Sequence, residues 1–431
     1  MRLTLATLVL SLAGLGMSAH AQSPAPRPAL VAPAVYSAPR PMSRPDPAAT
    51  VQTVSLSDDA FQDWLAGFRI RARAQGISDR TMDLAFAGVS YDPAIIARDG
   101  NQAEFSKALW EYLDSAVSAT RIRNGQAALA TYSRTLDRIE RTYGVDKEVV
   151  VAIWGLESAY GVNRGKSDVI QSMATLAYHG RRADLFEAQL IAALKIIQAG
   201  DVAPRGMTGS WAGAMGHTQF MPTSYLAFAV DFTGDGKRDI WSDDPTDALA
   251  STAAYLARSG WTRGQPWGVE VTLPRGFDYA LAGHGSGRTV GDWTRIGVRD
   301  MSGRPVRDYG TASILLPAGA RGPAFMIFGN FRAIERYNSA DSYVIAVGHL
   351  ADRLKGAPDF AAAWPRNDRA LRSSERIELQ ARLTARGYNT QGVDGRIGPN
   401  TISAIRQYQN AAGLVPDGYA SVALLVALRD G

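Results

Sequence analysis

The chain of 431 residues contains no cysteine at all. This absence excludes disulfide bonds and every reaction that depends on a thiol. It also excludes a bacterial lipoprotein, because the acyl chains of such a protein are attached to a cysteine that follows the cleaved leader. Any catalytic or stabilising chemistry must therefore come from other side chains.

Histidine is scarce, and the motifs of two common hydrolase classes are missing. None of the five histidines has the H-E-x-x-H spacing of a zinc site, which argues against a metallo-amidase. The stretch "GHGSG" at 283–287 is not the G-x-S-x-G of a serine hydrolase. His217 lies in a glycine-rich loop, where a plain loop histidine is favoured over one that touches a substrate.

Charge of one sign is also never concentrated. The formal net charge is only +5, and lysine and arginine are scattered without a dense run or a basic-aromatic repeat. A mildly basic surface suits an acidic partner but is equally ordinary for a soluble protein. Nucleic acid is therefore not an expected partner.

The first residues have the pattern of a secretory signal peptide. Arg2 precedes an apolar run from 3 to 16, and Ala19-His20-Ala21 forms an A-x-A site before Gln22. We expect cleavage after residue 21. The alternative, an uncleaved anchor helix, is disfavoured because the run is short for a bilayer. No later segment is predicted to span a membrane, so we expect an exported protein without a membrane anchor.

The remaining chain divides by composition, and its 46% hydrophobic residues suffice for a large core. The predicted fold class is α+β and mainly helical. The predicted parts are a signal peptide at 1–21, a Pro/Ala-rich linker at 22–54, a main domain at 55–355, a second linker at 356–373 and a small domain at 374–431. Helices are predicted near 132–143, 183–199, 247–258 and 343–354, a strand at 267–274, and loops with short strands at 280–330.

The stretch "VVVAIWGLESAYG" at 149–161 ends a long apolar run in a single carboxylate, Glu157. Asp146 is the predicted N-cap of this helix, after Gly144 closes the preceding one. A helix that is apolar on nearly every face belongs in a core. Partial burial and the negative end of the helix dipole would both raise the pKa of Glu157, as a general acid requires. A solvated, inert Glu on an exposed last turn is the alternative, and the helix alone does not decide.

A downstream loop, "GSWAGAMGHTQFMP" at 209–222, combines glycines and aromatic residues with the polar side chains of Ser210 and Gln219. Aromatic faces stack on sugars, and amides and hydroxyls bind sugar hydroxyl and N-acetyl groups. This composition suits a carbohydrate cleft, although a tight glycine-rich turn in the core remains the alternative.

Together with "RYNSADSY" at 336–343 and the segment 174–197, these motifs resemble the soluble lytic transglycosylase B family of peptidoglycan-cleaving enzymes over roughly 58–355. The resemblance implies a lysozyme-like α+β catalytic domain, with Glu157 of the E-S-x-x-G motif as its one catalytic carboxylate. It implies cleavage between N-acetylmuramic acid and N-acetylglucosamine that leaves a 1,6-anhydromuramyl end. By the same match the substrate would be bound by Ser210, Gln219, Phe220, Met221, Tyr255, Tyr337, Asn338 and Tyr343.

The implied substrate is the glycan strand of peptidoglycan, and the implied location is the periplasm of a Gram-negative cell. Proteins of cell-wall synthesis or division are the further partners that this function suggests. Two alternatives stay open at this stage. One is a non-catalytic peptidoglycan-binding or divisome scaffold that kept the fold. The other is a lysozyme-type hydrolase, which makes the same cut but leaves a reducing end.

The stretch "DFTGDGKRDIW" at 231–241 resembles the first part of an EF-hand loop. Glycine occupies the sixth place, but the twelfth is Ser242 rather than the usual glutamate. Some members of the family bind calcium here with a later aspartate. The candidate ligands are Asp231, Thr233, Asp235, Asp239 and Asp247. A turn held by Asx hydrogen bonds is the alternative. No cofactor is expected to be required, and any calcium would be structural.

The residues from 374 to 431 carry L-Q-x-x-L, two D-G pairs and A-I-x-x-Y-Q in order. This pattern resembles the small three-helix peptidoglycan-binding module of many wall enzymes. Its predicted core consists of Leu379, Leu383, Ile402, Ile405, Tyr408 and Leu414. The D-G pairs at 394–395 and 417–418 are predicted turns, with a structural role favoured over ligand binding.

Overall fold

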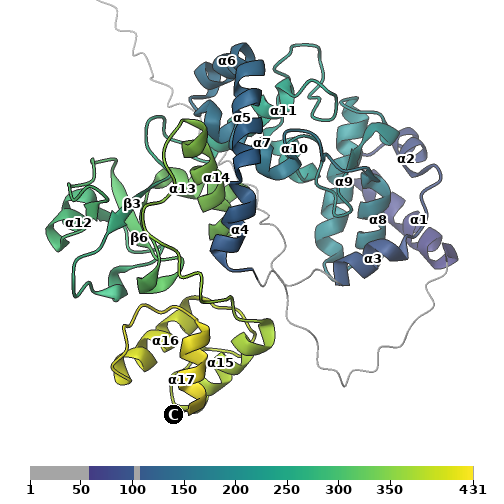
Figure 1. Cartoon of the computed structure of the whole chain (residues 1–431). Helices are drawn as coiled ribbons and strands as arrows, with labels where there is room; N and C mark the ends of the chain where they lie inside the picture. The colour runs from purple at the N-terminus through teal and green to yellow at the C-terminus, as the bar shows by residue number, and fades with distance from the viewer. Residues whose placement is uncertain (1–57, 101–106, 431) are drawn as a thin grey trace, which may run out of the picture. The chain divides into compact units, whose positions relative to one another are not determined.

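The computed structural model describes residues 58–100 and 107–430 (Figure 1). The predicted signal peptide and first linker lie outside these residues. The first helices are α1 (Asp58–Ala74), α2 (Asp79–Phe86), α3 (Pro93–Gly100), α4 (Leu109–Ala116), α5 (Ala119–Thr131), α6 (Ser133–Tyr143), α7 (Lys147–Ser158), α8 (Val169–His179) and α9 (Ala183–Ala199). The later ones are α10 (Pro222–Phe228), α11 (Thr246–Arg258), α12 (Val290–Ile296), α13 (Gly329–Tyr337), α14 (Asp341–Leu354), α15 (Ser373–Ala385), α16 (Pro399–Ala411) and α17 (Val422–Asp430).

One hydrophobic core is built by α1, α2 and α3 with α8, α9 and α10. α8 packs along α9, and side chains such as Phe61, Met173 and Leu190 are fully buried between the helices. The predicted stop of α9 is confirmed, because Gly200 follows it with a φ of 85°, in the left-handed region that glycine adopts without strain.

A second core surrounds α7, which packs against α5, α11 and α14 (Figure 1). Every residue from Val149 to Gly155 is buried, which confirms that the apolar run is a core helix. Gly144 and Asp146 hold the predicted end and start positions, although the Asp146 side chain makes no capping hydrogen bond. The apolar run therefore fixes the last turn of α7 in the middle of the domain.

A five-stranded antiparallel sheet separates this second core from a third one. Its order is β4-β6-β7-β3-β5, and its strands are β3 (Gly268–Thr272), β4 (Arg288–Thr289), β5 (Arg299–Asp300), β6 (Thr311–Leu315) and β7 (Ala324–Ile327); a separate pair joins β1 (Ser167–Asp168) to β2 (Thr208–Gly209). In β7, Phe325 and Ile327 enter the core of α7, whereas Ala324 and Met326 enter the core around Trp293. This alternation is the two-residue period of a strand buried on both faces.

The strand predicted at 267–274 is thus confirmed as β3, but the prediction of loops and short strands at 280–330 missed a helix. α12 starts with a capping box in which Thr289 and Asp292 exchange hydrogen bonds. The T-x-x-D spacing was a detectable start signal. Seven residues are too few to show a clear helical period of apolar side chains, so the sequence pattern predicts a loop here.

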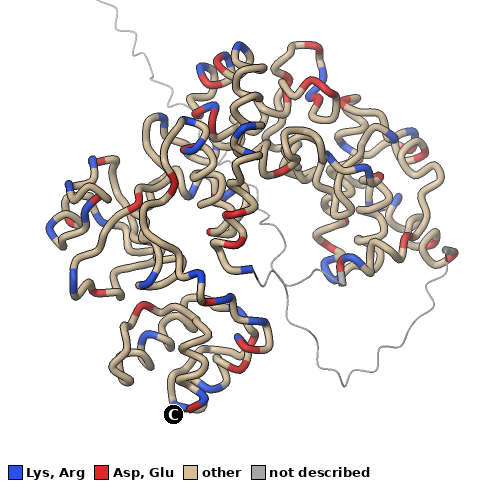
Figure 2. Tube along the Cα trace, in the orientation of Figure 1, with Lys and Arg blue, Asp and Glu red and all other residues tan. Residues whose placement is uncertain are grey.

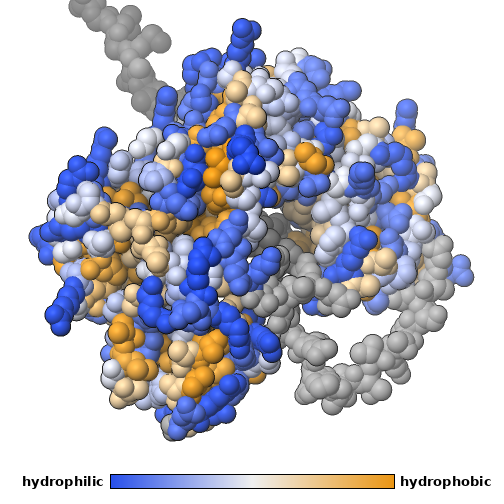
Figure 3. Space-filling model, viewed as in Figure 1, coloured by the Kyte–Doolittle hydropathy of each residue, from blue (hydrophilic) through white to orange (hydrophobic). Residues whose placement is uncertain are grey.

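The C-terminal residues form the three helices α15, α16 and α17 around a core of their own. Leu379, Leu383 and Ile405 are buried as predicted, but Leu414 is 43% exposed and was wrongly assigned to the core. Leu424, Leu425 and Leu428 of α17 fill that role instead. Hydrophobic surface is visible over this module in Figure 3, and five of the nine exposed large hydrophobic residues of the described chain belong to it.

Both D-G pairs of this module are held by the same pattern of hydrogen bonds. Gln380 donates to Asp394 and accepts from the Gly395 N–H, and Gln409 does the same with Asp417 and Gly418. The glutamines are buried, so each amide exchanges two hydrogen bonds with one turn. The two turns are confirmed, with a clear structural role.

Charges are mixed over the described residues, and Lys and Arg alternate with Asp and Glu without a large region of one sign (Figure 2). None of the described helices is both long enough and apolar enough to cross a membrane.

Candidate active site

The site is organised around the end of α7, where the helix stops within one turn of Glu157. Ala159, Tyr160 and Gly161 follow with φ values of 51°, 61° and 87°, all in the left-handed region. Two of these three residues carry a Cβ, for which that region costs on the order of 1 kcal/mol or more each. The surrounding contacts must offset this cost.

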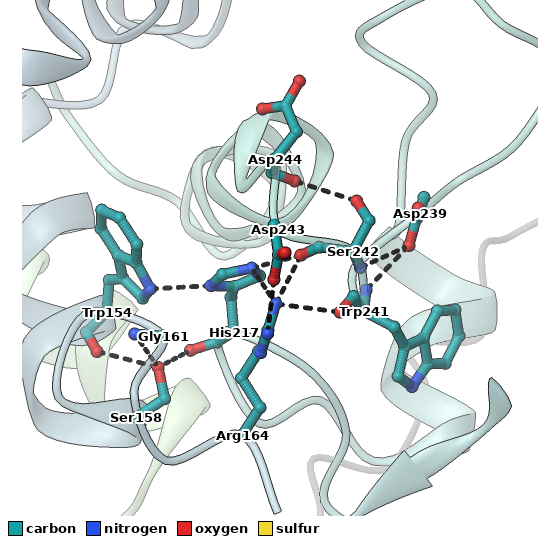
Figure 4. A network of polar contacts seen from close by, with 10 residues as sticks. All are labelled: Trp154, Ser158, Gly161, Arg164, His217, Asp239, Trp241, Ser242, Asp243 and Asp244. Atoms are coloured by element: carbon teal, nitrogen blue, oxygen red, sulfur yellow. Dashed lines mark hydrogen bonds and ion pairs between the residues drawn. The ribbon is translucent and has the colours of Figure 1, made fainter.

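Ser158 and Tyr160 provide those contacts. The Ser158 hydroxyl donates to the carbonyl of His217 and accepts from the Gly161 N–H at 2.9 Å. The Tyr160 hydroxyl donates to the carbonyl of Arg121 at 2.7 Å. The serine of the E-S-x-x-G motif therefore links the turn after α7 to the glycine-rich loop, and Figure 4 shows this bond.

His217 is the centre of the network in Figure 4 and is 3% exposed. The indole N–H of Trp154 donates to Nδ1 at 3.1 Å, so Nε2 carries the proton and donates to the carbonyl of Ser242 at 2.7 Å. Burial lowers the pKa of His217, and the nearby Arg164 guanidinium acts in the same direction. His217 is thus a buried group with a lowered pKa in the turn at 216–219, so it is a loop histidine as favoured, and a contact with a substrate stays a prediction.

Glu157 itself is half-buried. Burial raises its pKa to about 7, and a hydrogen bond from Tyr343 opposes this rise. The Tyr343 hydroxyl donates to Oε1 at 2.6 Å. No carboxylate of the described residues contributes to the pKa of Glu157. A carboxyl group with this pKa is partly protonated near neutral pH.

The aromatic residues predicted from the motifs come together beside Glu157. Tyr337 lies parallel to Tyr343 at 6.5 Å between ring centres, and it contacts Phe220 at 5.9 Å and Tyr255 at 4.9 Å. Phe220 and Tyr255 are buried, and the Tyr255 hydroxyl bonds to the carbonyl of Arg336. These two side chains pack behind Tyr337, so their contact with a substrate stays a prediction.

The polar residues of the same prediction lie in two places. Ser210 and Gln219 line a cavity of about 480 Å³ with Trp241. Ser210 accepts from the Ala214 N–H, and the Gln219 amide donates to the carbonyls of 164 and 216. Met221 is half-buried at the start of α10, and Asn338 accepts from the Ala340 N–H before α14. Their roles as ligands of a substrate stay predictions.

Of the candidate metal ligands, Asp231, Asp235 and Asp247 place carboxylate oxygens within 4.8 Å of one another. The oxygen donors of this group fit a calcium ion. Asp239 is not part of this group, and its carboxylate accepts from the N–H groups of Trp241 and Ser242. Thr233 donates to Asp231 at 3.2 Å. The carboxylates of Asp231 and Asp247 also accept three N–H bonds each, so the loop is held by its own Asx network as well.

Comparison with known families agrees with this arrangement. The model of the transglycosylase SLT domain matches residues 60–352, and that of a putative peptidoglycan binding domain matches residues 372–428. The chain belongs to the transglycosylase SLT family. Its mainly helical architecture is the lysozyme-like fold of that family, and its close homologues are lytic murein transglycosylases, which are enzymes.

Three relatives place the chain within this family. It is 32% identical over 250 residues to membrane-bound lytic murein transglycosylase B of Escherichia coli, a match that spans 56% of the chain and 66% of that relative. SltB3 from Pseudomonas aeruginosa, solved with NAG-anhNAM-pentapeptide, is 53% identical with a TM-score of 0.83, over 86% of this chain and 99% of SltB3. Slt35 of Escherichia coli, solved with calcium, is 27% identical with a TM-score of 0.59, over 69% of this chain and 93% of Slt35.

Several residues that shape this SLT site were not among those predicted. Arg121 holds the turn through its carbonyl, and Arg164 contacts His217. Tyr112 of α4 lies near enough that the charge of Glu157 contributes to its raised pKa of about 12, after burial. Tyr160 could have been predicted as a site residue, because it lies inside the E-S-x-x-G motif. Tyr112 and Arg121 are distant in sequence and had no such signal, and nothing in the pattern marked Arg164, although it follows the motif by three residues.

Proposed function

We propose that the protein is a lytic transglycosylase that cleaves the β-1,4 bond between N-acetylmuramic acid and N-acetylglucosamine and leaves a 1,6-anhydromuramyl end. The observation that carries this proposal is the carboxyl group of Glu157, whose pKa is raised to about 7 without a contribution from another carboxylate of the described residues and whose Oε1 is bonded to Tyr343 at 2.6 Å. A hydrolase that activates water or forms a glycosyl-enzyme normally needs two carboxylates.

A single carboxyl group suffices when the substrate supplies its own nucleophile. Protonated Glu157 gives its proton to the glycosidic oxygen as the bond from that oxygen to C1 of the muramyl residue breaks. The Glu157 carboxylate then takes the proton of the C6 hydroxyl of the same sugar, whose oxygen bonds to C1. Glu157 is protonated again at the end. An intramolecular hydroxyl has a large effective concentration, which offsets the lack of a second catalytic group.

Tyr343 is proposed to hold the Glu157 carboxyl in the orientation that this proton transfer needs. Ser210, Gln219, Met221, Tyr337 and Asn338 are proposed to line the glycan cleft, with Phe220 and Tyr255 packed behind them. Support for this assignment comes from the contacts among these residues and from the complexes of SltB3 with NAG-NAM-pentapeptide and NAG-anhNAM-pentapeptide.

Digestion of purified peptidoglycan tests the reaction. The expected products carry 1,6-anhydromuramyl ends, which are one water lighter than reducing ends in mass spectrometry. Reducing ends instead would identify a lysozyme-type hydrolase. Glu157→Gln should lose product release by at least a thousandfold. A Glu157→Gln enzyme as active as the wild type would refute the catalytic assignment, and wild-type protein that binds but never cleaves would be a scaffold.

We propose that calcium, where it binds at Asp231, Asp235 and Asp247, has a structural role only. These carboxylates belong to a loop distinct from the bond between Glu157 and Tyr343. A chelator should therefore leave the initial rate unchanged, whereas added calcium should raise the melting temperature. Loss of activity with chelator at a temperature well below melting would contradict this proposal. With this function we propose a periplasmic location and partners among the proteins of cell-wall synthesis or division.

A further inference from the structure

The cavity lined in part by Ser210 and Gln219 carries positively charged side chains. It has a volume of about 480 Å³ and is lined by two cationic residues, Arg164 and Lys166, and by the indole of Trp241. None of the described residues that line it is an aspartate or a glutamate. The cavity therefore favours a ligand with negative charge.

The two cations are not equivalent. Arg164 is engaged within the protein: Nη1 donates to the carbonyl of Trp241 at 3.0 Å and Nη2 pairs with Asp243 at 2.8 Å, as Figure 4 shows. Lys166, two residues further, is exposed and has no hydrogen-bond or ion-pair partner among the described residues. Lys166 therefore brings an uncompensated positive charge to the cavity.

The cavity also carries exposed aliphatic surface. Val162 is 79% exposed, the highest fraction for any large hydrophobic residue of the described chain, and it belongs to the same lining. An aliphatic side chain beside a free ammonium suits a ligand with both small apolar groups and carboxylates. The glycan of peptidoglycan has no free carboxylate where stems are attached, because the muramyl lactyl group is then an amide. The stem peptide has both alanine methyl groups and free carboxylates.

We infer that this cavity binds the stem peptide of the substrate, with Lys166 paired to a stem carboxylate. The inference rests on the proposed function for the identity of the substrate. Ser210 and Gln219, which line the same cavity, are proposed glycan ligands, so the stem would lie in this cavity next to its own muramyl residue. The enzyme would then prefer strands with charged stems over strands with neutral ones.

A ratio of two rates tests this inference. One batch of glycan strands keeps its stem carboxylates, and a second batch has them converted to primary amides. The preference is kcat/KM on the charged strands divided by kcat/KM on the amidated strands. We expect Lys166→Gln to reduce this preference by about two- to fivefold, the range of an exposed ion pair. Lys166→Arg should largely retain it, and so should Lys195→Gln, which removes an exposed lysine of α9.

Each outcome decides the matter. A wild-type preference of one, or a preference that Lys166→Gln leaves unchanged, overturns the inference. An equal loss on both kinds of strand assigns Lys166 to the glycan and also overturns it. If the wild type cleaves neither strand, the proposed function fails, and the same ratio is then measured as binding affinities of the two muropeptides to Glu157→Gln. A binding ratio that responds to Lys166 supports stem recognition without catalysis, and one that does not refutes it.

Discussion

At the scale of single residues, the proposed chemistry depends on one carboxyl group and one hydroxyl group. Burial raises the pKa of Glu157 to about 7, and the hydrogen bond from Tyr343 limits that rise. Burial also raises the pKa of Tyr343, which therefore remains a donor across the working pH range. The pair gives a proton donor whose position and acidity are set by separate contacts.

Glu157 should destabilise the folded protein above neutral pH. Its pKa is raised from 4.5 when unfolded to about 7 when folded, so the stability it contributes below pH 4.5 is lost as the pH rises through 7. We expect Glu157→Gln to be more stable than the wild type by about 1–2 kcal/mol at pH 8, after allowance for solvent access, and equal to it at pH 4. Urea unfolding measures this, with Asp63→Asn on the exposed face of α1 as control. Equal stability at pH 8 would contradict the burial of the charge.

Tyr343→Phe should shift the pH profile upward. The lost hydrogen bond had lowered the pKa of Glu157, so this pKa rises and the alkaline limb of kcat/KM moves to higher pH by about 0.5–1 unit. The rate at pH 6 should still fall severalfold because the carboxyl is less well oriented. Tyr309→Phe, which removes a hydroxyl beside the core around Trp293, is the control. A limb that stays or moves to lower pH would assign Tyr343 another role.

At the scale of elements, the end of α7 depends on two glycines that leave no room for a Cβ, Gly155 in the helix and Gly161 in the turn after it. A Cβ on Gly161 would lie 2.6 Å from Nδ1 of His217, and a Cβ on Gly155 would lie 2.6 Å from the Tyr160 ring. Both distances are shorter than side chains tolerate. Glu157 is therefore held in place by three features together: the left-handed turn, the buried His217 and the hydroxyl of Ser158.

Gly161→Ala should separate steric fit from backbone strain when it is compared with Gly200→Ala. Both glycines have φ near 86°, but a Cβ on Gly200 meets no atom within 4 Å. Gly200→Ala should cost about 1 kcal/mol of stability with no loss of rate. Gly161→Ala should cost about 2–4 kcal/mol and lower kcat at least tenfold, because His217 and the turn must shift. Thermal unfolding and kcat at one pH measure both, and equal effects would refute the role of the His217 contact.

At the scale of the whole molecule, the predicted linker at 356–373 contains no helix or strand before α15 begins at Ser373, but it is partly fixed against the main domain. Phe360 stacks on His349 at 3.8 Å, and the N–H groups of Ala361 and Ala362 donate to Glu270. Trp364 contacts Trp110 at 6.2 Å between ring centres. The first half of this segment, through Trp364, therefore packs on the main domain.

Truncation should distinguish the two halves of this segment. A chain that ends at Gly356 loses the contacts of Phe360 and Trp364, and we expect its melting temperature to fall by about 5 °C. A chain that ends at Ala370 keeps them and should melt like the main domain of the full chain. Both should bind peptidoglycan more weakly than the full chain but cleave short soluble fragments at similar kcat, because the module acts through local concentration. An equal melting temperature for both truncations would show that the segment is dispensable.

The sequence by itself determined the elements whose signals are local. The apolar run of α7, the glycines that end α6 and α9, and the D-G turns follow from the period and turn chemistry of neighbouring residues. Motif resemblance named the cleft residues, and it placed Glu157 and Tyr343 in one site. Leu414 was misassigned because apolar spacing does not specify which face of a small module is covered.

The tertiary structure alone decided the contacts that set acidity and position. Tyr343 lies 186 residues from Glu157, and the partners of His217 come from Trp154 and Ser242. The neutral state of His217, the pKa of Glu157 and the free ammonium of Lys166 all depend on which distant side chains pack nearby. Protonation states and pKa values follow from burial and long-range hydrogen bonds, and they cannot be predicted from neighbouring residues in the sequence.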